Sequence, residues 1–153
     1  MPAALPLVCS FVACAAAAAS DVRARKIPNA IPIALAVFGV AYHALGGWNS
    51  LALAVSAGLA VLVLGTLPFG MGWIGGGDVK LVAACACALE WWQILPLFVY
   101  TALAGGALGL VVIALRRSGK LRSPAELPYA VAIAAGVGWL TLGSTLVPSI
   151  RIL

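Results

Sequence analysis

Two aspartates are the side chains of this sequence best suited to chemistry. Asp21 directly follows a run of small residues, and Asp78 directly follows Gly75, Gly76 and Gly77. Two carboxylates that meet cannot both ionise cheaply, so they share one proton. Such a pair can hydrolyse a peptide bond, because one carboxylate activates a water while the other donates to the carbonyl oxygen. We expect the glycines to let an extended substrate backbone approach Asp78 closely.

The remaining reactive side chains support no second kind of site. His43 is the only histidine, and the topology derived below places it on the membrane face opposite the aspartates. No Ser-His or Cys-His set is therefore expected beside them. A zinc site needs converging ligands, and the two cysteines nearest in sequence are separated by a single residue, which is too tight for the usual ligand pair. All four cysteines lie in apolar runs and are interpreted as buried small hydrophobes: Cys9, Cys14, Cys85 and Cys87. We expect no metal and no cofactor.

Nucleotide and nucleic acid are also excluded as ligands. Residues 70–75 read G-M-G-W-I-G, which matches a dinucleotide-binding spacing. That spacing has meaning only between a strand and a helix of a βαβ unit, and here it lies between two apolar segments. The net charge of +5 is explained by the short basic loops of a membrane protein, so it indicates no nucleic-acid surface.

The composition predicts an all-α membrane protein. Hydrophobic residues make up 64% of the chain and charged residues only 8%, whereas soluble domains carry about 25% charge. We interpret residues 1–153 as one integral membrane domain with the lipid bilayer as its surroundings. Abundant small residues favour close helix packing, hence a compact bundle. A spanning helix needs about 20 apolar residues, and six segments are candidates: 3–20, 30–46, 50–67, 78–91, 94–115 and 128–147.

The basic residues predict the orientation of these spans. Eight of the nine lie beside the connections that follow the first, third and fifth segments: Arg23, Arg25, Lys26, Lys80, Arg116, Arg117, Lys120 and Arg122. Cytoplasmic loops hold the excess of Lys and Arg. All eight share one side only if there are six spans with both termini outside the cytoplasm, which requires a break at residues 90–93. There a glutamate and two tryptophans mark a membrane surface. Asp21 and Asp78 then lie at the cytoplasmic ends of their helices, where they can face each other.

Three segments carry a resemblance to a known family. Gly75-Gly76-Gly77-Asp78-Val79-Lys80 resembles the G-x-G-D-h-K signature, with h apolar, of the type IV prepilin peptidases. Residues 21–29, D-V-R-A-R-K-I-P-N, resemble their first-aspartate motif D-x-R-x-x-x-I-P-N. Residues 127–136 are similar to the proline-led start of the family's last span. The three motifs follow the family's order, and with the six spans the resemblance covers essentially the whole chain.

This resemblance implies a function and a location. It implies that Asp21 and Asp78 are the catalytic aspartates of a peptidase in the bacterial inner membrane, working on the cytoplasmic face. Its substrate would be a prepilin or pseudopilin cut after glycine, between a basic leader and an apolar helix. Longer members carry a cytosolic insertion, associated with N-methylation, for which residues 22–29 leave no room. We therefore expect a cleavage-only form, like those of Flp or tight-adherence pili; an archaeal preflagellin peptidase is a neighbouring possibility.

Four further residues have interpretations that the sequence leaves open. Lys80 either orients substrate and biases the charge of Asp78, or anchors its helix at the inner surface. Arg23 either holds the loop after the first span, meets the substrate, or is a topological charge. Pro28 and Asn29 are interpreted as the start and the cap of the second span, without a catalytic role.

Two other functions remain as alternatives. A small proton- or cation-coupled transporter would use the same two aspartates, although it predicts acids near the bilayer midplane and commonly an inverted repeat. A non-enzymatic assembly subunit would keep the fold, and a missing aspartate would favour it. Both aspartates are present.

Overall fold

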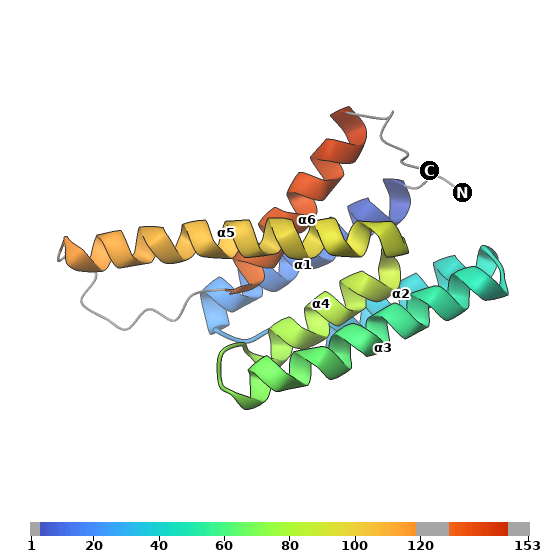
Figure 1. Cartoon of the computed structure of the whole chain (residues 1–153), viewed down its shortest axis with the longest axis horizontal. Helices are drawn as coiled ribbons and strands as arrows, with labels where there is room; N and C mark the ends of the chain where they lie inside the picture. The colour runs from blue at the N-terminus through green and yellow to red at the C-terminus, as the bar shows by residue number, and fades with distance from the viewer. Residues whose placement is uncertain (1–3, 119–128, 147–153) are drawn as a thin grey trace.

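The chain folds into six helices, described by a computed structural model over residues 4–118 and 129–146 (Figure 1). They are α1 (Ala4–Ala24), α2 (Ala30–Leu45), α3 (Trp48–Gly70), α4 (Gly76–Ala88), α5 (Trp91–Arg117) and α6 (Tyr129–Leu146). No strand occurs within these residues, which confirms the all-helical prediction. Three helices are long and apolar enough to cross a membrane: α1, α3 and α5 as far as Leu115. The apolar α2 and α6 are shorter, and α4 has only 13 residues.

The predicted break in the long apolar stretch 78–115 is confirmed. α4 ends at Ala88 and α5 begins at Trp91. The side-chain oxygen of Gln93 accepts a hydrogen bond from the Glu90 N–H at 3.0 Å, and the Gln93 N–H donates to the Glu90 carbonyl at 2.8 Å. This reciprocal pair satisfies donors that the start of α5 would otherwise leave unpaired.

The helices form two groups of three. In the first, α4 packs along both α2 and α3, and eight of its 13 residues are buried. The backbones approach closely there: a Cβ atom on Gly39 of α2 would lie 2.7 Å from the Cα of Ala88. In the second group, α6 packs on both α1 and α5. A Cβ atom on Gly138 of α6 would lie 2.9 Å from the ring of Phe11.

The two groups meet along a narrower seam. α1 packs on α2 less than on α6, and it touches α4 over a short length. Buried side chains from both groups nevertheless share one core, which includes Leu7 and Cys14 of α1 with Leu81 and Cys85 of α4. The two sulfur atoms, Cys14 Sγ and Cys85 Sγ, are 3.4 Å apart. All of the cysteines except Cys9 are buried, as expected for small hydrophobes.

The helix ends divide between two sides of the molecule. α1, α3 and α5 all end toward the left in Figure 1, the side that carries Arg23, Lys26 and Arg117. Trp48 and Trp91 begin α3 and α5 toward the opposite side. The segment that holds Lys120, Arg122, Glu126 and Pro128 lies outside the described residues.

Candidate active site

Asp21 lies in the last turn of α1, which continues to Ala24 rather than ending at residue 20 as predicted. Arg25 follows with a positive φ of 51°, and its N–H donates to the Asp21 carbonyl at 2.8 Å. This is a left-handed helix cap on a non-glycine residue. The hydroxyl of Ser20 donates to the Lys26 carbonyl at 2.9 Å. Together these bonds turn the chain back along the end of α1.

Asp78 lies in the first turn of α4, after a tight reversal from α3. Gly72 has a φ of 73° and donates to the Phe69 carbonyl, while Trp73 donates to the Pro68 carbonyl, as in a Schellman motif. This is why the segment needs glycine at position 72, the second glycine of the dinucleotide-like spacing. Gly75 is extended at the N-cap of α4, and its carbonyl accepts hydrogen bonds from the Asp78 and Val79 N–H groups.

The register of α1 against α4 places both aspartates at the same level. The two helices run in opposite directions (Figure 1). Cys14 and Cys85 touch across the seam; Cys14 is seven residues before Asp21, and Cys85 is seven residues after Asp78. Seven residues are about two helical turns, so each aspartate lies on nearly the same face of its helix as its cysteine. The cysteine contact therefore predicts that the aspartates meet.

Asp21 and Asp78 do line one cavity, of about 310 Å³. Its walls come from the end of α1, the α1–α2 connection and the start of α4: Asp21, Arg25, Lys26, Ile27, Asn29, Gly75, Gly76, Gly77 and Asp78. The cavity thus joins the two predicted motifs, which are far apart in the sequence.

The cavity favours a protonated Asp78. This residue lies in the first turn of α4, at the end of the bundle. Burial and, to a smaller extent, repulsion by Asp21 raise the pKa of Asp78 to about 6, against an opposing backbone hydrogen bond from Gly75. Its Oδ1 atom is buried and has no hydrogen-bond partner among the described residues. A carboxyl with a raised pKa holds its proton to higher pH than an ordinary aspartate, so beside a second carboxylate it can donate that proton while the second accepts one.

The three glycines before Asp78 make room for the protein's own side chains. A Cβ atom on Gly77 would lie 3.1 Å from the Cβ of Ile27, and one on Gly75 would lie 2.9 Å from the Asp78 carboxylate. Gly76 faces the ring of Phe69 in the same way, at 3.1 Å. The contact between Gly77 and Ile27 holds the two motifs together. The use we expected for these glycines, room for a substrate backbone, stays a prediction.

The predicted supporting residues are placed differently from the aspartates. Lys80 is exposed and does not line the aspartate cavity; its ammonium group donates to the Asn29 side-chain oxygen at 3.1 Å. Arg23 is exposed and is likewise not a lining residue. Asn29 occupies the N-cap position of α2 as predicted, but its side chain makes no capping hydrogen bond. Asn29 is a cavity residue that the sequence reasoning missed, because its partner Lys80 lies 51 positions away.

His43 lies near the far end of α2 from this cavity, in agreement with its predicted separation from the aspartates. Its ring is buried, with Nε2 donating to the Ala88 carbonyl at 3.2 Å and Nδ1 accepting from the Ser50 hydroxyl at 2.8 Å. These bonds tie α2, α3 and α4 together. No three His, Cys, Asp or Glu side chains within residues 4–118 and 129–146 are placed to hold a metal ion.

Fold and site together define a helical membrane protein with a carboxylate pair at one end of its bundle. The model of the type IV leader peptidase family matches residues 8–110, a range that contains both aspartate motifs. The chain therefore belongs to the type IV leader peptidase family.

Curated relatives agree with this assignment. Proteins of Burkholderia pseudomallei strains 1026b and K96243, both named prepilin leader peptidase/N-methyltransferase, are 31% identical over 137 residues. The alignment covers 83% of this chain and 43% of each relative, so the chain spans less than half of their length. No solved structure matches the chain.

Proposed function

We propose that this chain is an aspartic endopeptidase that removes the leader peptide of prepilin-type substrates at the cytoplasmic face of the bacterial inner membrane. The observation that carries this proposal is the shared cavity of Asp21 and Asp78. Membership of the leader peptidase family gives the reaction class. The two Burkholderia relatives, named for prepilin processing, support the substrate class.

The proposed reaction uses one shared proton. The ionised Asp21 takes a proton from a water molecule, whose oxygen attacks the carbonyl carbon of the scissile bond. Asp78, which the raised pKa favours as the protonated partner, donates to the carbonyl oxygen. Collapse of the tetrahedral intermediate breaks the C–N bond and returns a proton to the leaving amine. The products are a leader with a new carboxylate and a mature chain with a new N-terminal amine.

The proposed topology has six spans with both termini outside the cytoplasm. The ends of α1, α3 and α5 lie on one side of the molecule (Figure 1). The exposed Arg23 and Lys26 lie at the end of α1, and the exposed Lys80 lies near the start of α4. An inside-positive orientation then puts that side, and the aspartates, in the cytoplasm.

Within the family we propose a cleavage-only enzyme that acts on Flp-type prepilins. Only Arg25–Asn29 separates α1 from α2, which leaves no space there for a folded cytosolic insertion. A transporter using the same aspartates is less well supported, because both lie at one end of their helices and not near the middle.

The test is to replace each aspartate by its amide. Asp21→Asn and Asp78→Asn keep the shape of the side chain but remove the shared proton, so each should lower the cleavage rate of a co-expressed prepilin by about a hundredfold or more. Processing is measured by gel mobility and by mass spectrometry of the new N-terminus.

The matched control is Glu90→Gln, which likewise replaces a carboxylate by an amide, at the residue just before α5. It should cleave at the wild-type rate. Retained cleavage in either aspartate variant would remove that residue from the mechanism, provided all three variants reach the membrane in equal amounts.

A further inference from the structure

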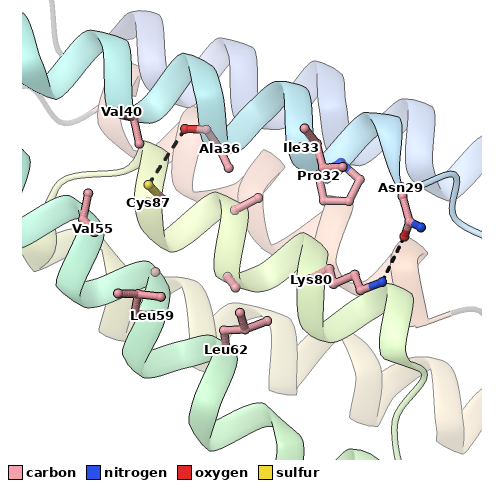
Figure 2. Close-up of a pocket in the computed structure, with 13 residues that line it drawn as sticks. Asn29, Pro32, Ile33, Ala36, Val40, Val55, Leu59, Leu62, Lys80 and Cys87 are labelled. Carbon is pink, nitrogen blue, oxygen red and sulfur yellow. Dashed lines mark hydrogen bonds between the residues drawn. The ribbon is translucent and has the colours of Figure 1, made fainter.

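A second concave surface lies beside the aspartate cavity. It is an apolar groove of about 400 Å³ whose walls come from α2 and α3 and whose floor is α4 (Figure 2). Figure 2 shows Ile33 and Val40 on the α2 wall and Leu59 and Leu62 on the α3 wall. We call this surface the α2–α3 groove.

Small residues make the groove concave. Its floor and inner walls are formed by Ala36, Gly58, Ala83, Ala84 and Cys87. A Cβ atom on Gly58 would lie 3.0 Å from the Cβ of Cys87, so α3 and α4 are already as close as their backbones allow. The larger side chains stand out at the rims, where Ile33 and Leu59 are 60% and 55% exposed.

The α2–α3 groove adjoins the aspartate cavity. Asn29 lines both, and Lys80 lines the groove beside it. From Asn29 to Val40 the groove follows α2 for 11 residues, or about 16 Å. It therefore begins at Asn29, beside the aspartate cavity, and leads away from that cavity along α2.

A positive charge at the junction between the aspartate cavity and the α2–α3 groove disfavours a basic peptide segment in the groove. The Lys80 ammonium group, held by Asn29, stands where the two spaces join. A cation there repels the basic part of a peptide and leaves the apolar lining to an uncharged segment. The aspartate cavity also carries Arg25 and Lys26 beside its two carboxylates, so the part of the substrate that the groove side of the junction fits is the uncharged apolar helix.

We propose that the α2–α3 groove holds the apolar helix of the substrate immediately after the scissile bond. This inference rests on the proposed function and adds the site that recognises the uncleaved part. A peptide bond lying at Asp21 and Asp78 has its following residues within reach of Asn29, since an extended chain advances about 3.3 Å per residue. The groove then has the length of about eleven helical residues, and small floor residues let a helix approach closely.

Photocrosslinking tests occupancy without requiring turnover. A benzoylphenylalanine is placed at Leu59 in the groove, or at Leu64, about 140° further round α3 and 65% exposed. Both variants carry Asp78→Asn and are reconstituted in phosphatidylethanolamine–phosphatidylglycerol vesicles. The probe is a synthetic substrate with a basic leader, a glycine and an apolar helix of about 20 residues.

Crosslinking to the helix from position 59, with at least tenfold less from position 64, is the expected result. Equal crosslinking from both positions, or crosslinking only to lipid at position 59, would overturn the proposal. Because the aspartate variant does not need to cleave, this readout stands even if the proposed reaction fails.

Kinetics separate helix binding from catalysis. Leu59→Trp fills the groove, and Leu64→Trp adds the same bulk on the lipid-facing side. Each variant is assayed on the long substrate and on one truncated after the first few apolar residues, and kcat/KM for the long substrate is divided by kcat/KM for the short one. For Leu59→Trp we expect this ratio to fall about tenfold. For Leu64→Trp it should not change. An equal loss on both substrates, or no loss on either, would overturn the proposal. Failure of the proposed function itself would appear differently, as no cleavage by the wild-type protein.

Discussion

The two helix groups are built in different ways. α4 is enclosed by α2 and α3, so protein atoms hold it on most sides. α5 is the opposite case, because Gln93 and Leu97 are its only buried side chains among those described. The candidate site takes Asp78 from the enclosed helix and Asp21 from the end of α1, which belongs with α5 and α6. One aspartate is thus fixed by dense packing, and the other by a short hydrogen-bonded turn across the seam.

The largest effect is expected from a substitution that disrupts the packing of α4 against α2. Gly39→Val places new atoms within 2.7 Å of the Ala88 backbone, which cannot rotate away. We expect a loss of about 3 kcal/mol or more in the free energy of unfolding. The matched change Gly109→Val on α5 meets no atom within 4 Å and should be tolerated. Thermal unfolding in detergent measures both, and equal losses would contradict the difference between the groups.

The next effect disturbs the seam itself. Gly77→Ala brings a Cβ to 3.1 Å from the Cβ of Ile27, so the two motifs must move apart by a few tenths of an ångström. We expect kcat/KM for prepilin cleavage to fall about tenfold while the unfolding temperature changes little. Gly106→Ala on α5, where no atom lies within 4 Å, is the control. Full activity of the Gly77 variant would show that this contact does not position the aspartates.

A smaller effect concerns the electrostatic repulsion between Asp21, on α1, and Asp78, on α4. Asp21→Asn removes the repulsion but leaves the burial, so the pKa of Asp78 should fall below about 6 and stay above 3.8. Asp78 would then lose its proton at lower pH than in the wild type. Infrared titration of the protonated carboxyl band measures this, with Glu90→Gln as the unchanged reference. An unaltered pKa would mean that the two carboxylates do not interact.

The smallest structural change tests the register across the seam. Cys14 Sγ and Cys85 Sγ are 3.4 Å apart and need only a slight approach to bond. A membrane-permeant oxidant should link them within one chain, which mass spectrometry of a proteolytic digest detects. In a Cys14→Ala variant, Cys9 is the remaining cysteine of α1 and serves as the internal reference, which should form no link to Cys85. A link from Cys14 to Cys87 in place of Cys85 would contradict the antiparallel register that aligns the aspartates.

The sequence predicted those features that local composition controls. The break between α4 and α5 was signalled by a glutamate and two tryptophans, and the structure places it there. The aspartates were singled out because charges are rare in an apolar chain, and the structure puts both in one cavity. Each of these signals lies within a few residues of the feature it predicts.

Features that depend on distant partners were missed. Asn29 was expected to cap α2, whereas its side chain binds Lys80 of another helix. The end of α1 was placed before Asp21, because polar residues usually end an apolar span, yet the helix continues until Arg25 adopts its left-handed conformation. The close approach of Gly77 to Ile27 was likewise invisible in a sequence motif that shows only adjacent residues.

The length of α5 has a consequence for how the protein sits in lipid. Its apolar part has 25 residues and is about 38 Å long, against a hydrocarbon layer of about 30 Å. Complete immersion therefore requires α5 to tilt, and by more than α3, whose 23 residues are about 35 Å long. A change in bilayer thickness would therefore lean the two helix groups by unequal angles. Bilayer thickness would in this way affect how the two helix groups meet at the seam, where both aspartates lie.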